Sequence, residues 1–297
     1  MKKLILILAS ILLFIFVFLT LLSFRGDYCA ERELWGIDRK LIFIAAHQES
    51  TPDYIINQLI GRYKAFAKIH NRSKFSQSAQ RMIGNLYSLR KNYSQARLEF
   101  QKAVGPDNEL SAQAEFAIAK TYELEDRWDK ALLTYRDIIQ YYPDTNFGFS
   151  VPIYLTDHLV TSGNQKDYTD RAYADALSFY QMIAIKNPKS KLEYNALKMV
   201  ALCQLNLKDW SGTVKTMGDL ILKYPRGKSI QEAVSAINML CVTKLHDYDL
   251  GINIYGQFIQ KYPDHPANPY LSKMIKNLQE LNKRKLIVQT VSKTATK

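Results

Sequence analysis

Residues that could support catalysis or metal binding are scattered along this sequence of 297 residues. The histidines and cysteines show none of the spacings typical of a metal site, such as H-x-x-x-H or C-x-x-C. They are His47, His70, His158, His246, His265, Cys29, Cys203 and Cys241. Neither a glycine-rich phosphate-binding loop nor a nucleophile motif around a serine occurs. Acidic pairs such as Glu123 and Glu125 fall at predicted helix ends, where a solvated or capping carboxylate is the ordinary case. The sequence therefore predicts no enzyme, no metal site and no cofactor.

Composition restricts the kind of partner. The chain is 47% apolar, with a formal net charge of +12 and a sequence pI near 9.4. Lys and Arg alternate with Asp and Glu instead of forming a basic stripe, so we do not expect nucleic-acid binding. With only 12 Gly and 9 Pro, the chain is expected to be ordered and to bury a sizeable core.

The N-terminus carries a localisation signal. After Lys2 and Lys3 come 21 uncharged residues, from Leu4 to Phe24. As a helix they would be about 31 Å long, which matches the hydrocarbon core of a bilayer. We therefore predict a signal anchor, or transmembrane helix, within residues 1–28. Because positive charge favours the cytoplasmic side, the rest of the chain is expected to be exported to a periplasmic or extracytoplasmic space.

Two other fates of this N-terminus stay open at the level of sequence. Cys29 could carry a lipid, but Tyr28 stands before it where a lipoprotein signal needs a small residue. A cleaved signal peptide needs a small-residue cleavage site, and "RGDYCAE" offers no such pattern. An inner-membrane anchor is therefore favoured over a lipoprotein.

Everything beyond residue 30 is typical of helices. Apolar residues recur at helical spacing, as at Leu34, Ile37, Leu41 and Ile44, and no segment shows sustained strand alternation. Short breaks with Pro, Gly and Asp separate helices of about 12 to 18 residues. The sequence predicts an all-α chain of about six helical hairpins over residues 29–281. A basic and disordered tail is predicted for residues 282–297.

A short proline phrase closes four of these hairpins. It reads "YYPDT", "KNPKS", "KYPRG" and "KYPDH", with prolines at 143, 188, 225 and 263 that lie 45, 37 and 38 residues apart. Proline lacks a backbone donor and bars the preceding residue from helical geometry, so each phrase is expected to end a second helix. Periods of this length indicate stacked repeats.

Two adjacent stretches make the repeat explicit. From Gly84, the offsets 3, 9, 12, 16 and 19 give Tyr87, Tyr93, Ala96, Phe100 and Ala103. From Ala119, the same offsets give Tyr122, Trp128, Ala131, Tyr135 and Ile138. Small residues let paired helices approach, so we expect Gly84 to face Ala96 and Ala119 to face Ala131. Weaker copies start at Ala201 and at Met239, where a bulky residue takes the close-contact position.

This pattern resembles the tetratricopeptide repeat (TPR), a helix-turn-helix unit of 34 residues. The resemblance implies a right-handed superhelical stack of hairpins behind the N-terminal helix. It also implies a groove, lined by the first helix of each hairpin, that accepts a protein or peptide. Exported and tethered to a membrane, the chain resembles the TPR lipoproteins of the outer-membrane β-barrel assembly machinery and TPR periplasmic proteins of the Tol system. It departs from the former because it lacks a proper lipoprotein signal.

The resemblance places the candidate partner-binding residues on the first helices. They are Arg81 and Asn85 on one helix, Lys120 on the next and Lys198 on a later one. Arg81, Lys120 and Lys198 would form a basic groove for an acidic segment or a C-terminal carboxylate. Asn85 would add both a donor and an acceptor.

Three functions follow as hypotheses. The first is a membrane-anchored scaffold that faces the periplasm, binds a protein partner and serves cell-envelope or outer-membrane assembly or secretion. The second is an accessory subunit that recognises cell-wall glycan, suggested by the 19 Tyr and 13 Phe. The third is a hydrolase on a helical scaffold, for which no motif is visible. The partner and the oligomeric state are left open.

Overall fold

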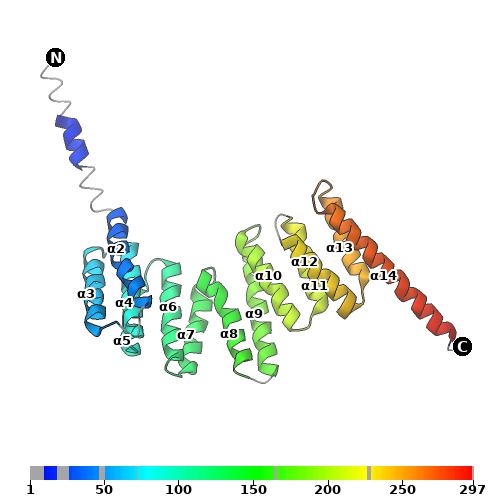
Figure 1. The fold of residues 1–297 in the computed structure, drawn as a ribbon, viewed down its shortest axis with the longest axis horizontal. Coiled ribbons are helices and arrows are strands. Elements are labelled where there is room, and N and C mark those ends of the chain that lie inside the picture. Colours follow the sequence, from blue (N-terminus) through cyan, green and yellow to red (C-terminus); the bar gives the residue numbers. More distant parts are fainter. Residues whose placement is uncertain are drawn as a thin grey trace, which may run out of the picture. The chain divides into compact units, whose positions relative to one another are not determined.

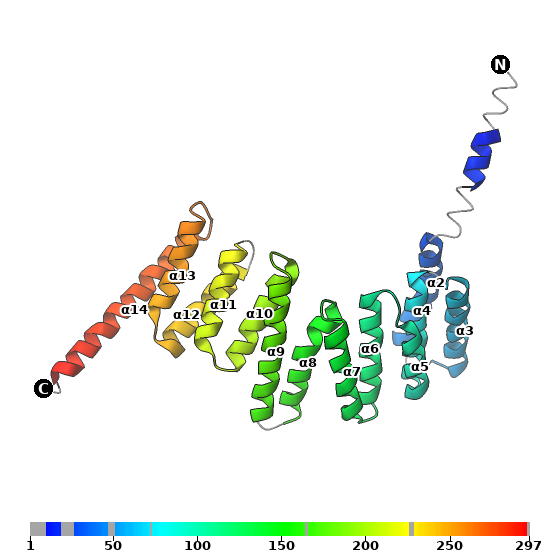
Figure 2. The ribbon, with the colours of Figure 1, turned by 180° about the vertical axis from the view of Figure 1, so that it is seen from behind.

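The computed structural model describes residues 10–18, 27–46, 51–71, 73–163, 166–225 and 229–295, and their regular structure is helical throughout. This confirms the all-α prediction for these residues. The chain forms two compact units, Met1–Val151 and Pro152–Lys297 (Figure 1; Figure 2).

The helices are arranged as hairpins in both units. The first unit contains α2 (Asp27–Ala46), α3 (Asp53–Ile69), α4 (Lys74–Leu89), α5 (Tyr93–Ala103), α6 (Asn108–Glu123) and α7 (Trp128–Tyr141). Helix α8 (Asn146–Thr161) begins in the first unit and ends in the second. The second unit continues with α9 (Lys166–Lys186), α10 (Lys191–Asn206), α11 (Trp210–Lys223), α12 (Ser229–Leu240), α13 (Tyr248–Lys261) and α14 (Asn268–Ala295). The order of these helices is compatible with the predicted chain of about six hairpins, and that number stays a prediction.

Each proline phrase lies where the sequence predicts it. Helices α7, α9, α11 and α13 end at Tyr141, Lys186, Lys223 and Lys261, and the proline follows two residues later in every case. The residues of the second helices at offsets 12 and 19 are buried in each copy, from Ala96 and Ala103 to Gly251 and Phe258. The repeat pattern thus marks the side of each second helix that packs in the core.

Four of the hairpin turns share a left-handed residue that the sequence analysis missed. It lies seven positions after the start of each copy and is never glycine: Lys91, Asp126, Lys208 and His246. In three of the turns the next amide donates to a carbonyl five residues earlier, at 2.9 Å: Asn92 to Tyr87, Arg127 to Tyr122, and Asp209 to Gln204. Such bonds satisfy the last carbonyls of the first helix. The turns therefore reverse the chain in the same way in both units.

The predicted close contacts differ in two of the copies. The nearest neighbour of Gly84 is the ring of Phe100, which an added Cβ would meet at 2.5 Å, and the contact with Ala96 stays a prediction. Met239 is 52% exposed instead of lying at a helix contact. A π-helical turn, Cys241–Leu245, follows α12 and adds one residue before the hairpin turn. A fixed offset counted back from the hairpin turn therefore reaches a residue on a different face of α12.

Two of the three cysteines lie in the core. Cys203 and Cys241 are free and buried. Burial raises the pKa of both thiols to about 11. They act as small apolar core residues.

The predicted membrane segment, residues 4–24, lies mostly outside the described residues, and only 10–18 are described, as a helix. In the part of the chain that the structure describes, no helix combines the length and the apolar character needed to cross a membrane. At the other end, α14 extends to Ala295, whereas the sequence predicts disorder from 282. The reason is that no Gly or Pro follows Pro269 to stop this helix.

Candidate functional site

The first helices α2, α4 and α6 form a continuous row in the first unit, because α2 contacts α4 and α4 contacts α6. Arg81 and Asn85 lie on α4 and Lys120 lies on α6, so three predicted residues belong to neighbouring helices of this row. Lys198 lies on α10 in the second unit. We call the row of α2, α4 and α6 the first-helix face.

Buried tyrosines of the second helices reach the first helix of their own hairpin. The hydroxyl of Tyr63 donates to Asp38 at 2.5 Å, and that of Tyr135 donates to Glu123 at 2.6 Å. In the second unit Tyr255 donates to Asn238 at 2.9 Å. All three rings are fully buried. The hydroxyls therefore fix a polar acceptor on each of these first helices, as a buried Tyr requires.

Arg81 lies beside the Tyr63 and Asp38 pair. Burial lowers the pKa of its guanidinium, while the charges of Asp38 and Tyr63 act in the opposite direction. Its Nε atom is buried and has no hydrogen-bond partner among the described residues. Burial, and then the bond to Asp38, raise the pKa of Tyr63 far above its ordinary value, so this hydroxyl stays a donor. Arg81 thus retains donor capacity beside a fixed carboxylate.

The predicted basic groove is less positive than the sequence suggests. Lys120 forms an ion pair with Glu123, the same carboxylate that accepts from Tyr135. Asp38 similarly lies near Arg81. Asn85 makes only a weak contact with the sulfur of Met82, at 3.7 Å. Each predicted cation in the first unit therefore has a carboxylate nearby, and its role in binding stays a prediction.

Lys198 adjoins a basic hollow in the second unit that the sequence analysis missed. Its ammonium lies 5.9 Å from the ring centre of Tyr194. Tyr194 lines a hollow of about 460 Å³ between the start of α10 and the end of α11. The remaining lining residues are Lys189, Ser190, Lys191, Lys223, Tyr224 and Pro225. These residues include parts of two proline phrases, so the lysines flanking Pro188 and Pro225 were a signal in the sequence.

The buried carboxylate of Glu193 accepts hydrogen bonds from three residues that line this hollow. Glu193 accepts from Lys223 at 2.8 Å, from Tyr224 at 2.6 Å and from the amide of Lys189 at 2.5 Å. Burial alone would raise the pKa of Glu193, but these bonds outweigh burial and lower it. Lys189 and Lys191 remain exposed at the rim.

Metal binding finds no support in the described part of the chain, where no three His, Cys, Asp or Glu side chains cluster. The aromatic count also has a structural explanation. The largest fully buried side chains are aromatic: Tyr63, Tyr135, Tyr180, Tyr255, Phe66, Phe100 and Phe258. The number of aromatic residues is therefore weak support for a glycan site.

Comparison with known proteins finds a family match for one of these hairpins. Residues 113–145 match the family model described as a tetratricopeptide repeat. The match covers most of α6, all of α7 and the first proline phrase. It supports the predicted repeat type for this hairpin, which we call the TPR hairpin. No curated protein sequence matches the chain.

Two solved structures are similar in outline. One is the "TPR2AB-domain:pHSP90-complex of yeast Sti1", with a TM-score of 0.34 and 10% identity over 86% of this chain and 100% of that chain. The other is the P58(IPK) TPR domain, with a TM-score of 0.29 and 12% identity over 86% of this chain and 67% of that chain. These scores are too low to support an argument about the site.

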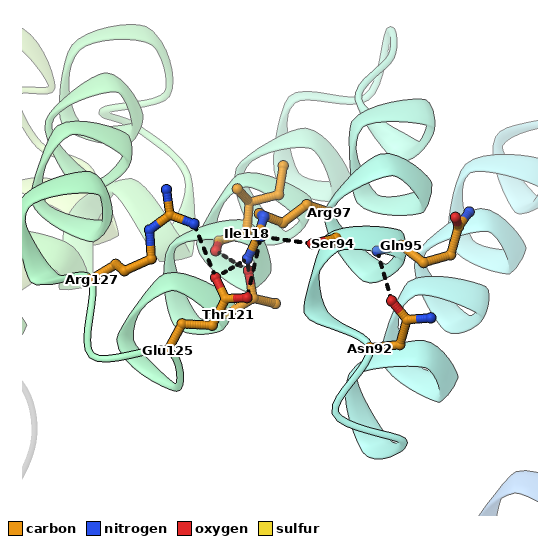
Figure 3. A network of polar contacts seen from close by, with 8 residues as sticks. All are labelled: Asn92, Ser94, Gln95, Arg97, Ile118, Thr121, Glu125 and Arg127. Carbon is orange, nitrogen blue, oxygen red and sulfur yellow. Dashed lines mark hydrogen bonds and ion pairs between the residues drawn. The ribbon is translucent and has the colours of Figure 1, made fainter.

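A polar network joins the TPR hairpin to the hairpin before it. Figure 3 shows Arg97 of α5 pointing at Glu125 and Thr121. Nη1 of Arg97 lies 2.7 Å from Glu125 and 3.2 Å from Thr121, and the guanidinium lies 4.4 Å from the ring centre of Tyr122. Arg127 contacts the same carboxylate at 3.5 Å. The network ties neighbouring hairpins at the turn of the TPR hairpin.

A second carboxylate of the TPR hairpin predicts a pH effect. Burial, and then the charge of Asp137, raise the pKa of Glu115 above its ordinary value. The native state then binds more protons than the unfolded state between the unfolded and the folded pKa, so stability falls as pH rises through that window. Glu115→Gln is expected to raise the thermal midpoint near pH 7 and to change it little near pH 3, where the carboxyl is protonated in both states. Circular dichroism melts at the two pH values measure this.

The matched control for this prediction is Glu232→Gln, which removes an exposed carboxylate from α12. A Glu115→Gln effect of the same size at both pH values would contradict the assigned cause.

Proposed function

We propose that the chain is a non-enzymatic, membrane-anchored scaffold that faces the periplasm or an equivalent extracytoplasmic space. In this proposal the first-helix face binds a protein partner, and the complex serves cell-envelope or outer-membrane assembly or secretion. Support comes from the stacked hairpins and from the TPR family match at residues 113–145. Stacked repeats present extended surfaces that suit protein partners.

The observation that carries this proposal is the state of Arg81. Its Nε is buried and has no partner among the described residues, and Asn85, one helical turn further along α4, makes only one weak contact. Residues four apart lie on one helix face. The buried Nε itself is out of a partner's reach, so the half-buried Arg81 can bind a carboxylate or a peptide carbonyl only through its terminal Nη groups, beside the Asn85 amide. Lys120 contributes less because it is paired with Glu123.

The proposed anchor rests on the sequence of residues 4–24. The uncharged stretch from Leu4 to Phe24 is long enough to span a bilayer, and Lys2 and Lys3 favour a cytoplasmic N-terminus. An uncleaved anchor in the inner membrane agrees better with the residues before Cys29 than a lipoprotein does.

Site-specific photocrosslinking in cells tests the proposed face. A crosslinking amino acid at position 88 of α4 is expected to yield an adduct with one protein, and the same group at Gln101 on the exposed side of α5 is not. Asn85→Ala is expected to weaken the adduct by about tenfold or more, because each hydrogen bond to a charged group contributes about 1.5 to 3 kcal/mol. Arg81→Ala is expected to abolish it.

The variants separate binding from folding. Asn85→Ala removes no strong internal contact among the described residues, so a normal melting curve together with a weakened adduct supports a role in binding. Arg81→Lys keeps the charge but loses the planar fork of donors, and it is expected to bind weakly. Equal adducts from positions 88 and 101, or none from either, would overturn the proposal.

A further inference from the structure

Helix α2 has two faces of different character. Ala30, Leu34, Ile37 and Ile44 point into the core and are at most 7% exposed. The opposite side carries aromatic, aliphatic and basic residues at spacings of 3, 4 and 7, which place them on one stripe. We call these residues the α2 stripe: Tyr28, Arg32, Trp35, Arg39, Ile42 and Phe43.

The apolar members of the α2 stripe are all exposed by more than half. Tyr28 is 70% exposed, Trp35 61%, Ile42 70% and Phe43 63%. Single exposed apolar residues are ordinary, but four on one helix face, at the first described hairpin of the stack, form a patch. Terminal repeats usually have a polar outer side. We therefore expect another surface to cover this apolar side of α2.

Positive charge accompanies the patch. Arg32 and Arg39 lie between the apolar residues, and the guanidinium of Arg39 is 5.1 Å from the ring centre of Trp35. Three acidic residues of α2 are instead bonded within the unit: Asp27 to Ser73, Glu33 to His70, and Asp38 to Tyr63. The fourth, Glu31, lies at the edge of the stripe. The surface that covers the α2 stripe should thus have an apolar interior and a negatively charged outer layer.

A hollow beside α3 continues the stripe. It has a volume of about 680 Å³ and lies between α2 and α3. Ile44, Ile55 and Leu59 form part of its apolar lining, while Arg39, Lys40 and Arg62 supply cations. Tyr54, which also lines it, is 71% exposed. The hollow joins apolar surface to three charges that could meet phosphate groups.

The position of α2 in the chain selects one occupant. The uncharged stretch from Leu4 ends at Phe24, and α2 begins at Asp27, so only two residues separate them. If that stretch spans a bilayer, the first turn of α2 must lie at the bilayer surface. Trp and Tyr favour this interfacial layer, and Arg side chains reach its phosphates.

The geometry points to a membrane-surface role for the first hairpin: the α2 stripe lies in the headgroup layer of an anionic bilayer, with Arg39, Lys40 and Arg62 at lipid phosphates. This inference rests on the proposed anchor at residues 4–24 and adds to it. The hairpin would be fixed against the membrane instead of swinging on a tether, so the helices that follow project from that surface.

Fluorescence quenching of Trp35 tests the inference on the full chain in phosphatidylglycerol-containing nanodiscs. The chain has three Trp, so Trp128→Phe and Trp210→Phe leave Trp35 alone. Lipids brominated near the headgroup are expected to quench Trp35 more than lipids brominated near the chain end. The matched control retains only Trp128, which packs against Tyr135, and it is expected to be quenched much less.

Charge reversal and carbonate extraction separate this inference from the proposed anchor. Arg32→Glu with Arg39→Glu is expected to reduce quenching of Trp35 while the protein stays in the carbonate-resistant membrane fraction. A carbonate-resistant protein whose Trp35 is not quenched overturns the inference and leaves the anchor standing. Release by carbonate overturns the anchor and the inference together. A crosslink between two copies at position 42, without quenching, identifies a second copy as the occupant and also overturns the inference.

Discussion

Replacing Gly148 by alanine is expected to destabilise the first unit by about 3 kcal/mol. An added Cβ would clash with the backbone oxygen of Tyr142 and lie 3.1 Å from Cα of Pro143. The obstacle is main chain, which cannot rotate away as a flexible side chain can. The turn is also fixed, because the Thr145 hydroxyl donates to Tyr142 at 2.7 Å and accepts from the amide of Gly148 at 3.0 Å. The clash therefore outweighs the gain of about 1 kcal/mol from Ala in a helix.

Thermal unfolding of the full chain in detergent, followed by circular dichroism, measures this effect. The transition of the first unit is expected to fall by roughly 5 to 10 °C. Gly61→Ala is the matched control, because its Cβ would meet nothing within 4 Å in α3. That change is expected to stabilise by about 0.5 to 1 kcal/mol. If both variants melt together, close approach at Gly148 is not what fixes the turn after α7.

Local rules explain why the second helices could be predicted. Pro143, Pro188, Pro225 and Pro263 each end a helix because of their own covalent structure, whatever the surroundings. Small and aromatic residues at fixed offsets similarly report on packing that recurs in every copy. A single first helix gives less information, since one face of it stays exposed. That is why Met239 was placed on the wrong face once a π-helical turn shifted the count by one residue.

The candidate site was harder to predict because charges were counted one residue at a time. Lys120 and Glu123 are three apart on one helix, so their ion pair was visible in the spacing. The bond from Tyr135 to Glu123 was not, because it depends on how two helices pack. The basic hollow near Lys198 likewise needs residues 190 and 224, which lie at the two ends of one hairpin and 34 residues apart in the chain, to come together. Sequence could therefore identify the helices of the site, but not the balance of charge on them.

The left-handed turns show a different limit. Lys91, Asp126, Lys208 and His246 have positive φ values, which non-glycine residues adopt at some cost. Composition alone would have suggested glycine at such a position. The sequence feature that marks these turns lies one residue later. There Asn92, Asp209 and Asp247 cap the start of the second helix with their side chains.

Arg97→Ala is expected to destabilise the first unit by about 2 to 3 kcal/mol, a loss between those of exposed and fully buried pairs. The side chains of Arg97 and Glu125 are only 11% and 23% exposed. Truncation removes two bonds to one carboxylate and the cation over Tyr122, and it leaves Thr121, 1% exposed, without this donor. Arg127, 3.5 Å from Glu125, can compensate only in part.

Arg284→Ala is the matched control, because Arg284 pairs with Glu280 at 3.0 Å but with 72% and 67% of the side chains exposed. An exposed pair four residues apart contributes about 0.3 to 0.5 kcal/mol, so this variant should melt close to the parent protein. A double-mutant cycle of Arg97→Ala with Glu125→Ala should give a coupling above about 1 kcal/mol, since the groups share one network. A coupling near zero would mean that apolar packing alone joins the TPR hairpin to its neighbour. In that case the turn network in Figure 3 would add little to the stability of the junction between the two hairpins.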